Sequence, residues 1–216
     1  MLLPALVGLD DAARRQILAG PRARFVRNEP VFHAGDPANS LHVLLSGHVS
    51  VEVTTPGGDQ VTLAVLGPGA TFGELALLRQ TATRSATVRA LDPAVTVILS
   101  KHRFEELRAE SPDLDRFLVR LLGGYVERLE TRLIDSLFVP VDKRVLRQLV
   151  VLSELYGDGG DGVIIPLTQD VIASTSGSTR PTTNQVLRRA VDEGLIAMSR
   201  GRILIVDAAR LATRAR

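Results

Sequence analysis

The sequence predicts an α+β fold in three parts: an N-terminal domain of antiparallel strands, a long central helix and a C-terminal winged helix-turn-helix domain. Three observations lead to this prediction. Short β-branched segments separated by glycine and proline turns dominate the first hundred residues. A long helical repeat of apolar residues follows Pro112. Two short helical patterns and a hairpin pattern come last, in the order of a winged helix-turn-helix.

The composition bounds the location and the chemistry. The chain has 216 residues, 45% of them hydrophobic, a net charge of +2 and no cysteine. Without cysteine there is no disulfide, thiolate nucleophile or cysteine-ligated iron–sulfur cluster. The four histidines lack metal-site spacing, so we expect no metal, haem or iron–sulfur cofactor. No apolar run reaches the ~20 residues of a membrane span. The N-terminus lacks the order of a signal peptide. We therefore expect a cytoplasmic protein with no membrane partner.

The first hundred residues read as one short helix and a series of short strands. Acidic residues in the first turn predict a helix over Asp10–Leu18. Turns at Gly35-Asp36 and Ser46-Gly47 separate the strands. The β-branched content predicts strands at Ala23–Val26, Pro30–His33, Leu41–Leu45, His48–Thr54, Gln60–Leu66 and Val95–Ser100. Many short strands with such turns predict a sandwich, a roll or a jelly-roll-like barrel.

The strongest functional signal lies in the segment FGELALLRQTATRSATVRA, which has the parts needed to hold a cyclic phosphate that carries a ribose. Gly73 lets the backbone approach a ligand, and Glu74 can accept hydrogen bonds from a sugar hydroxyl. Leu75 follows at the expected start of a helical turn whose free N–H groups favour an anion. Arg84 carries a charged fork suited to phosphate, and Ser85 adds a hydroxyl. The alternative is a glycine turn and a salt-bridged arginine on the surface of a β protein.

Two helices are expected after the strands. The first covers about Lys101–Ala109; the second begins near Pro112, which suits a first turn, and ends near Phe138. One apolar row of the second helix predicts packing on the β domain and contains Leu114, Leu118, Leu121 and Tyr125. The other row has heptad spacing and contains Val119, Leu122, Val126, Leu129 and Leu133. A heptad row predicts a two-helix coiled coil in a homodimer. The alternative is a helix buried on two sides within a monomer.

A break separates the long helix from the last domain. Pro140 disfavours helix at Val139, so we expect a hinge over residues 139–142. Helix is expected to resume over Lys143–Tyr156. The expected domains are therefore residues 1–110, the β domain; 111–138, the central dimerisation helix; and 143–216, the C-terminal domain.

The segment TQDVIASTSGSTRPTTNQVLRRAVDEGL has the pattern of a helix-turn-helix. Thr168 is placed to cap a helix that ends near Thr175, and Gly177 lies in the tight turn. Ser178 or Thr179 is expected to cap the second helix. The expected buried face of this second helix contains Val186, Leu187, Ala190 and Val191.

A predicted hairpin follows the second helix and forms a wing. Its strands cover Ile196–Ser199 and Ile203–Val206, with Arg200 and Arg202 at the tip for phosphate contact. In this motif the second helix presents its N-terminal residues to the major groove. The partner is therefore double-stranded DNA, and the expected contacts are Thr168, Ser178, Thr179, Arg180, Thr182, Thr183, Gln185, Arg200 and Arg202.

Together, the ligand segment and the helix-turn-helix resemble the cyclic-AMP receptor protein family of bacterial transcription regulators. The likeness covers nearly the whole chain. It implies that the N-terminal domain is a β-roll and that the central helix forms a homodimer. It also implies that a cyclic nucleotide binds through the ligand-segment residues Gly73, Glu74, Leu75, Arg84 and Ser85.

The helix-turn-helix departs from the family at two positions. Arg180 matches the family's first base-reading arginine, which pairs with guanine O6 and N7. Pro181 stands where the family commonly has glutamate, and Gln185 replaces a later arginine. We therefore expect an operator that differs from the family's best-known half-site.

The base contacts also depart from the family. Members that respond to cyclic AMP (cAMP) use a Thr-Ser pair on the central helix for the adenine amine. The matching positions are Leu129 and Glu130, followed by Thr131. Leu129 cannot form a hydrogen bond, whereas Glu130 can accept one from an exocyclic amine. Glu130 and Thr131 are the expected base contacts, and the identity of the base stays open at this point.

The sequence predicts a homodimeric, cAMP-responsive transcription regulator that acts on a palindromic operator, with RNA polymerase as a candidate partner. One alternative is a regulator of the same family that binds DNA without a cyclic nucleotide or senses another small molecule. A more distant alternative is a cyclic-nucleotide-binding regulatory subunit of an enzyme. Catalysis is not expected, because the sequence lacks a Ser/His/Asp arrangement, a metal cluster and a nucleotide-triphosphate loop.

Overall fold

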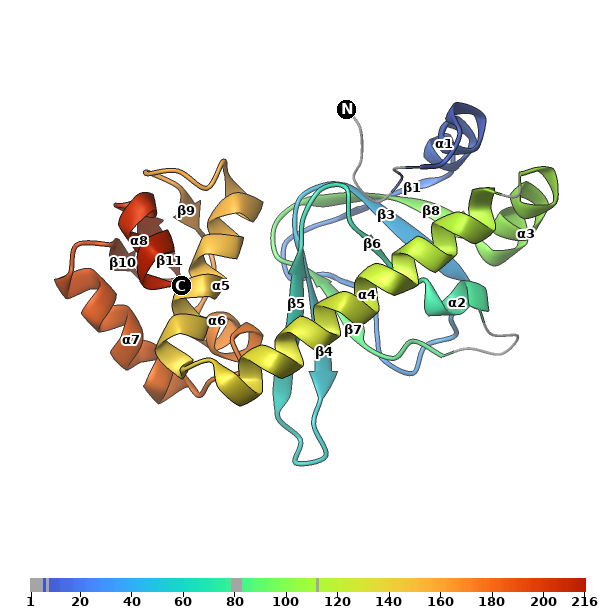
Figure 1. The fold of residues 1–216 in the computed structure, drawn as a ribbon. Helices are drawn as coiled ribbons and strands as arrows, with labels where there is room; N and C mark the ends of the chain where they lie inside the picture. The colour runs from blue at the N-terminus through green and yellow to red at the C-terminus, as the bar shows by residue number, and fades with distance from the viewer. Residues whose placement is uncertain (1–5, 7, 79–82, 112) are drawn as a thin grey trace. The chain divides into compact units, whose positions relative to one another are not determined.

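The computed structural model in Figure 1 describes residues 6, 8–78, 83–111 and 113–216. The chain forms two compact units. The first contains Met1–Gln60 and Ala64–Arg128, and the second contains Val61–Leu63 and Leu129–Arg216. The long central helix therefore contributes residues to both units. Within the described ranges, no helix has the length and apolar character that crossing a membrane requires.

Helix α1, Asp11–Leu18, opens the first unit. The Asp10 carboxylate caps this helix by accepting a hydrogen bond from the backbone N–H of Ala13 at 2.7 Å. Ala13 and Ile17 are buried, so one face of the helix packs on the domain. The predicted helix is confirmed, with Asp10 as its cap.

The strands of the first unit form two four-stranded sheets with the orders β1-β8-β3-β6 and β2-β7-β4-β5. The strands pair in antiparallel fashion in β1–β8, β8–β3, β3–β6, β2–β7 and β7–β4. The strands are β1 Arg22–Phe25, β2 Pro30–Phe32, β3 Ser40–Ser46, β4 Val49–Thr54, β5 Gln60–Leu66, β6 Thr71–Phe72, β7 Thr87–Ala90 and β8 Ala94–Ser100. Each predicted strand is confirmed to within one residue at either end. The sequence does not predict β6 and β7, which carry the two ends of the ligand segment.

Two apolar clusters hold the first unit together. One joins strands of the first sheet to the surrounding helices and contains Leu6, Leu9, Ile17, Leu41, Val43, Leu77, Val97, Leu99, Phe104, Leu107, Leu114, Phe117 and Leu118. The other joins strands of both sheets and contains Leu44, Val49, Phe72, Val88, Ala90 and Ala94. Burying a side chain of this size contributes about 1.5–3 kcal/mol. Phe72 is in the second cluster, so the residue just before Gly73 is anchored in the core.

Helix α2, Leu75–Leu78, lies between β6 and β7, and helices α3, Lys101–Glu110, and α4, Asp113–Phe138, follow β8. Ser100 caps α3 by accepting a hydrogen bond from the backbone N–H of Arg103 at 3.1 Å. Pro112, the expected start of α4, lies outside the described residues.

The two apolar rows of α4 differ in burial. Leu114 and Leu118 are buried, and Leu121 packs against the same core cluster. This confirms that the first row packs on the β domain. In the second row, Val126 is 54% and Leu133 59% exposed, and Val119 and Leu129 are exposed as well. The alternative of a helix buried on two sides within one protomer is therefore wrong.

Helix α5, Val141–Tyr156, begins two residues before the expected start at Lys143. The later start is wrong because Pro140, with φ −53° and ψ 143°, stands at the N-cap, so the following residue enters the helix directly. The break in helix is thus confined to Val139 and Pro140. A hinge over 139–142 stays a prediction.

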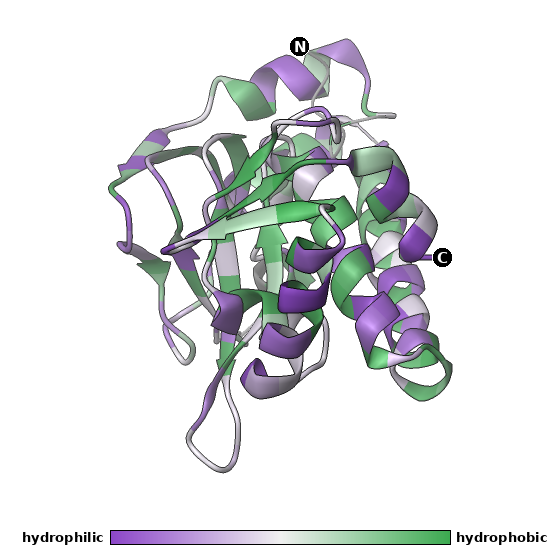
Figure 2. Cartoon of the chain, turned by 90° about the vertical axis from the view of Figure 1, so that its left-hand side faces the viewer, coloured by the Kyte–Doolittle hydropathy of each residue, from purple (hydrophilic) through white to green (hydrophobic). Residues whose placement is uncertain are grey.

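The C-terminal domain has helices α6 Gln169–Thr175, α7 Arg180–Asp192 and α8 Ala208–Arg214. Its sheet has the order β10-β11-β9, with β9 Ile164–Ile165, β10 Ile196–Ser199 and β11 Arg202–Ile205. The helix-turn-helix followed by a hairpin is the predicted winged fold. Figure 2 shows that helices carry both hydrophilic and hydrophobic residues, as expected for helices with one packed face.

Two details of this domain differ from the predictions. Val186, Leu187 and Ala190 are buried as expected, but Val191 is 36% exposed, so its place on the buried face of α7 is wrong. Arg202 is the first residue of β11, paired with Ser199. The turn of the wing is therefore Arg200-Gly201, and Arg202 stands beside the tip.

Candidate functional site

Within the ligand segment, the residue directly after β6 is a glycine that another residue could replace only with strain. Gly73 has φ +82°, a left-handed conformation that favours glycine. A Cβ at this position would lie 2.5 Å from Nη1 of Arg84 and 3.1 Å from the carbonyl oxygen of Ser40. Gly73 is thus required by the backbone and by the fit of the guanidinium.

Arg84 is buried and joins the ligand segment to β3. Its Nη1 donates to the carbonyl oxygen of Ser40 at 2.8 Å and to that of Gly73 at 3.4 Å. Its Nη2 donates to the Ser40 hydroxyl at 3.0 Å. The guanidinium carbon lies 4.0 Å from the centre of the Phe32 ring, a cation–π contact. Its Nε is buried and, among the described residues, has no hydrogen-bond partner.

Glu74 is the buried carboxylate of the same site, with 7% of its surface exposed. Its Oε2 is buried and finds no hydrogen-bond partner in the described part of the chain. Burial raises the pKa of Glu74, and the positive charges of Arg128 and Arg84 partly oppose that rise. An unpaired buried polar atom costs about 1–3 kcal/mol. An unpaired acceptor on Glu74 and an unpaired donor on Arg84 therefore indicate a site that a polar ligand completes.

His42 is a buried histidine near Arg84, and it packs on the core residue Phe72. The His42 ring stacks on Phe72 with centroids 5.2 Å apart and an interplanar angle of 10°. Its Nδ1 lies 3.1 Å from the Thr96 hydroxyl. Burial, and then the charge of Arg84, lowers the pKa of His42 to about 4. The ring is therefore neutral near pH 7 and adds no second positive charge next to Arg84.

The ligand segment faces a cavity of about 60 Å³. Its lining consists of Phe32, Ala38, Val51, Phe72, Gly73, Glu74, Leu75, Thr83, Arg84, Ser85, Ala86, Val88 and Tyr125. The structure thus brings together all the residues predicted to hold phosphate and ribose. This volume is smaller than that of most ligand pockets, which measure about 300–1,000 Å³.

The lining of this cavity does not include the predicted base contacts on α4. Glu130 and Thr131 are exposed and are not part of its lining, to which α4 contributes Tyr125. On an ideal α-helix they point about 140° and 120° away from Tyr125. Their role as base contacts stays a prediction. The apolar row that faces the β domain already contained Tyr125, and this was the signal for its place at the site.

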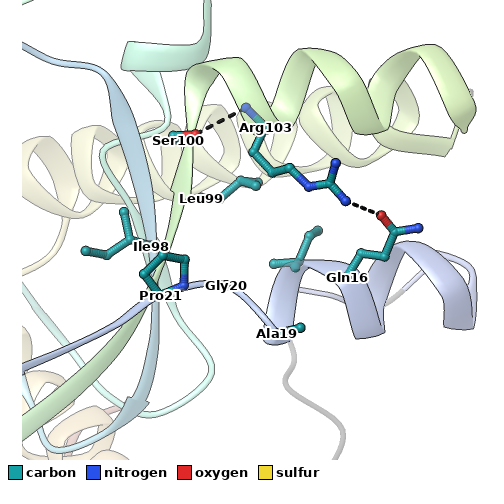
Figure 3. Close-up of a pocket in the computed structure, with 9 residues that line it drawn as sticks. Gln16, Ala19, Gly20, Pro21, Ile98, Leu99, Ser100 and Arg103 are labelled. Atoms are coloured by element: carbon teal, nitrogen blue, oxygen red, sulfur yellow. Dashed lines mark hydrogen bonds between the residues drawn. The ribbon is translucent and has the colours of Figure 1, made fainter.

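A larger hollow of about 380 Å³ lies elsewhere in the first unit, beside the end of α1 and the end of β8 (Figure 3). The guanidinium of Arg103 borders it and donates to Gln16 and to Glu106, both at 2.6 Å. None of the unpaired buried atoms found among the described residues lies on this hollow. It therefore lacks the unsatisfied polar groups that mark the ligand segment.

The helix-turn-helix is built on two capped helices. Thr168 caps α6 by accepting from the backbone N–H of Val171 at 3.4 Å. Thr179, rather than Ser178, caps α7 by accepting from the N–H of Thr182 at 3.4 Å. The turn between the helices passes through Gly177 at φ +62°. These caps fix the start of α7, the end that presents side chains to DNA.

Most of the predicted DNA contacts are available on the surface. Arg180 is exposed, and its Nε lies 3.4 Å from Asp170 of α6, a partner that the sequence analysis does not identify. Ser178 and Thr182 are half-buried. The remaining exposed candidates are Thr168, Thr179, Gln185, Arg200 and Arg202.

Thr183 is a wrong prediction, because its side chain is 0% exposed. It lies on the packed face of α7 with Val186, Leu187 and Ala190. These four residues have the i, i+3, i+4, i+7 spacing of one helix face. The same periodicity in the sequence was the signal that Thr183 packs inward and cannot contact DNA.

Two arginines of α5, which the sequence analysis does not identify, connect elements of the second unit. Arg144 donates to the carbonyl oxygen of Ser136 in α4 at 2.9 Å and to that of Gly177 at 3.0 Å. Arg147 donates to the Asp135 carboxylate at 2.8 Å. The last turns of α4 are thereby tied to α5 and to the turn of the helix-turn-helix.

Two family models match the chain where these two sites lie. The cyclic nucleotide-binding domain matches residues 22–111, which include the ligand segment. The Crp-like helix-turn-helix domain matches residues 143–214, which include α6, α7 and the wing.

Curated relatives match over most of their length. A protein of Mycobacterium tuberculosis named CRP-like cAMP-activated global transcriptional regulator is 31% identical over 195 residues, which is 89% of this chain and 87% of that protein. A cyclic AMP receptor protein of Thermus thermophilus is 28% identical over 88% of this chain and 86% of its own length.

Solved structures of similar fold cover most of the chain. A CRP-family transcriptional regulator from Thermus thermophilus is 28% identical, with a TM-score of 0.73 and coverage of 89% of this chain and 96% of that one. A global regulator from Xanthomonas campestris, described as responsive to c-di-GMP, is 25% identical, with a TM-score of 0.74 and coverage of 91% and 99%. With both domains matched and a 31% identical relative covered over most of its length, the chain belongs to the CRP family of cyclic-nucleotide-binding, DNA-binding transcription regulators.

Proposed function

We propose that the protein is a cAMP-responsive transcription regulator that binds a palindromic DNA site as a homodimer. The observation that carries the ligand part is a pair of buried atoms in one cavity, Oε2 of Glu74 and Nε of Arg84, for which the described residues supply no hydrogen-bond partner. A carboxylate acceptor suits a ribose hydroxyl, and a guanidinium donor suits a phosphate. Gly73 leaves the backbone free to approach the same ligand.

Two observations bear on the choice of nucleotide. The relatives from Mycobacterium tuberculosis and Thermus thermophilus carry cAMP in their names, which supports cAMP as effector. The Xanthomonas campestris regulator is described as responsive to c-di-GMP. A family member with another effector, or with none, is therefore the second candidate. The cavity of about 60 Å³ and the bonds from Arg84 to Ser40 favour a member with no nucleotide effector, because Arg84 is already engaged within the protein.

The homodimer is proposed from the exposed apolar row of α4. Val119, Val126, Leu129 and Leu133 repeat at the spacing of a heptad seam and are exposed in the single chain. The last turns of the helix add Leu137 and Phe138, which are 65% and 79% exposed. A second copy of α4 would remove this row from water, at about 25 cal/mol for each Å² of apolar surface buried.

A two-fold dimer implies a two-fold DNA site. Each α7 would enter a major groove, and half-sites about 34 Å apart match one turn of DNA. Arg180 is proposed as the base reader and Arg200 as the phosphate contact of the wing. RNA polymerase is proposed as a further partner and the cytoplasm as the location. The proposed domains are the β domain, residues 1–110; the central dimerisation helix, residues 111–138; and the C-terminal domain, residues 143–216, after a hinge over residues 139–142.

The ligand would act by favouring one arrangement of the dimer. A coupling of about 100-fold between ligand and DNA binding corresponds to about 3 kcal/mol. Arg144 and Arg147 offer a route for it within the second unit, because they tie the end of α4 to the helix-turn-helix. A hinge over residues 139–142 would then move together with the end of α4 and the helix-turn-helix.

The test is DNA selection followed by affinity measurement with and without cAMP. Operators are selected from random duplexes by the full-length protein, and fluorescence anisotropy then gives the affinity at fixed salt, because salt alone changes DNA affinity strongly. We expect cAMP to raise the affinity of wild type and to leave that of Arg84→Leu unchanged. Equal affinity of wild type in both conditions favours the effector-independent regulator instead.

A further inference from the structure

Tyr125 is the residue of α4 that lines the ligand cavity, whereas the family resemblance predicts base contacts at Glu130 and Thr131. It lines the cavity together with Glu74 and Arg84. Glu130 and Thr131 are exposed on other sides of the helix. A residue of α4 that meets the ligand of the same protomer must therefore come from the face of Tyr125.

The Tyr125 ring is held by the residue one turn later. The guanidinium carbon of Arg128 lies 4.8 Å from the ring centre, a cation–π contact between residues i and i+3 of one helix face. Gly124 makes room for this contact, because a Cβ there would lie 3.2 Å from Nη1 of Arg128. The neighbouring Gly123 has nothing within 4 Å of such a Cβ. The position of the Arg128 side chain thus favours glycine at 124 but not at 123.

Arg128 also belongs to the electrostatics of the site. Its positive charge acts on the Glu74 carboxylate together with that of Arg84, and both lower the pKa that burial raises. Asp36 and Glu74 are the carboxylates that act on Arg84, and Arg128 is a second guanidinium that acts on Glu74. An aromatic ring next to such a cluster offers a face on which a base can stack.

We propose that Tyr125 contacts the purine base of the bound cyclic nucleotide by stacking, and that Arg128 is the positioning residue that holds its ring. This inference rests on the proposed function, since it concerns the same ligand. It replaces the base contacts expected at Glu130 and Thr131 and makes base recognition depend on an aromatic face rather than on hydrogen bonds to an exocyclic amine.

The first experiment compares a probe that has the base with one that lacks it. Calorimetry measures binding of cAMP and of ribose 3′,5′-cyclic phosphate, which has no base. We expect Tyr125→Leu to weaken cAMP binding about tenfold or more while the base-free probe changes less than about twofold, because stacking on an aromatic ring is what is lost. Tyr125→Phe keeps the ring and should retain cAMP binding. An equal loss for both probes, or a loss in Tyr125→Phe as large as in Tyr125→Leu, overturns the stacking role.

The second experiment uses tyrosine emission. The chain has no tryptophan and two tyrosines, at positions 125 and 156. In Tyr156→Phe the emission reports Tyr125 alone, and we expect cAMP to quench it along the calorimetric binding curve and the base-free probe to leave it nearly unchanged. Binding without base-dependent quenching overturns the proposal.

Neighbouring variants test the positioning role and the specificity of the effect. Arg128→Met should weaken cAMP binding at least about threefold and reduce the quenching, because the ring loses its cation–π partner. Gly124→Ala should also reduce the quenching, whereas Gly123→Ala should leave it unchanged.

Glu130→Gln and Thr131→Ala should change cAMP affinity less than about twofold. A larger effect of either than of Tyr125→Leu contradicts the assignment. If wild type binds neither cAMP nor cGMP, the proposed function fails as well; binding that is insensitive to Tyr125 overturns this inference alone.

Discussion

Nη1 of Arg84 donates to the carbonyl oxygen of Ser40 at 2.8 Å, a bond that ties the ligand segment to the first residue of β3. The same nitrogen atom would lie 2.5 Å from a Cβ at Gly73. The position of the Arg84 guanidinium therefore depends on two features. One is the carbonyl oxygen of Ser40 in β3, and the other is the absence of a side chain at Gly73, which follows β6. These contacts do not satisfy the guanidinium fully, because its Nε has no hydrogen-bond partner within residues 8–78, 83–111 and 113–216.

Replacing Arg84 by leucine removes the cation and places an apolar side chain in the cavity lining. We expect Arg84→Leu to weaken cyclic-nucleotide binding by at least ~100-fold, because each hydrogen bond from a charged donor contributes about 1.5–3 kcal/mol. Unfolding should stay cooperative. Arg27→Leu is the matched control, since Arg27 is an exposed arginine of the same domain outside the cavity. Wild-type affinity in Arg84→Leu contradicts the site.

Gly73→Ala and Gly35→Ala separate backbone strain from loss of the site. Both glycines have positive φ, +82° and +90°, so alanine at either should cost about 1–2 kcal/mol of unfolding free energy. A Cβ at Gly35 has nothing within 4 Å, whereas at Gly73 it displaces Arg84. We therefore expect Gly73→Ala to lose ligand affinity and Gly35→Ala to keep it. Urea unfolding and calorimetry measure the two effects, and equal affinities in both variants count against the role of Gly73.

His42 makes stability depend on pH. Its pKa is about 4 in the folded protein and 6.5 when unperturbed, so the unfolded chain takes up a proton first as the pH falls. The unfolding free energy should therefore decrease between about pH 6.5 and pH 4, by at most about 1.4 kcal/mol for each pH unit. The raised pKa of Glu74 acts in the opposite sense, since that stability is lost as the pH rises through the folded value.

The variant His42→Gln isolates the histidine. It should have a shallower fall in unfolding free energy than wild type between pH 6.5 and pH 4, because glutamine does not titrate in this range. Urea denaturation across this range measures both proteins. Identical pH profiles would show that another group is responsible.

Leu133 tests the exposed row of α4. Leu133→Glu places a charge in the proposed seam, where it would be buried without a partner against its own copy, and we expect a monomer in analytical ultracentrifugation. Val151→Glu is the control, because Val151 is 55% exposed on α5 and lies outside the row. A Leu133→Glu protein that sediments as wild type, or a wild type that is monomeric, counts against the dimer.

Arg180 tests base reading by α7. Arg180→Ala should cost about 1–3 kcal/mol of DNA-binding free energy and relax the preference at one guanine. Arg188→Ala, at an exposed position later on the same helix, should weaken binding to all sequences equally and lower the salt dependence. Selection of random duplexes by both variants makes the comparison. A uniform loss in Arg180→Ala would make this residue a phosphate contact.

The sequence predicted those parts of the fold and of the site that are set by local chemistry. Gly73, Glu74 and Arg84 lie within one segment, and their residue types alone indicate a phosphate-and-ribose site. Pro140 was correctly placed at a break, but α5 starts earlier than predicted because proline itself can serve as the cap. Strands β6 and β7 were not predicted, because their residues were interpreted as part of the ligand segment. The alternating burial of β7 was therefore not recognised as a strand pattern.

What the sequence did not predict depends on tertiary packing or on the phase of a helix. Tyr125 reaches the cavity because α4 packs on the β domain, and no local motif marks a base contact there. Thr183 was placed at the DNA because of its neighbours, although its spacing from Val186 and Leu187 sets it on the buried face. Asp170 and Arg144 act through partners that are distant in sequence, Arg180 and Gly177.

The most direct test of the account is calorimetric titration of wild-type protein with cAMP, with cGMP titrated beside it and Arg84→Leu as the reference. We predict saturable binding of cAMP with one nucleotide per protomer, weaker binding of cGMP and no heat of binding in Arg84→Leu. Absence of binding of either nucleotide to wild type, or equal binding to Arg84→Leu, would contradict the assignment of Glu74 and Arg84 as a cyclic-nucleotide site.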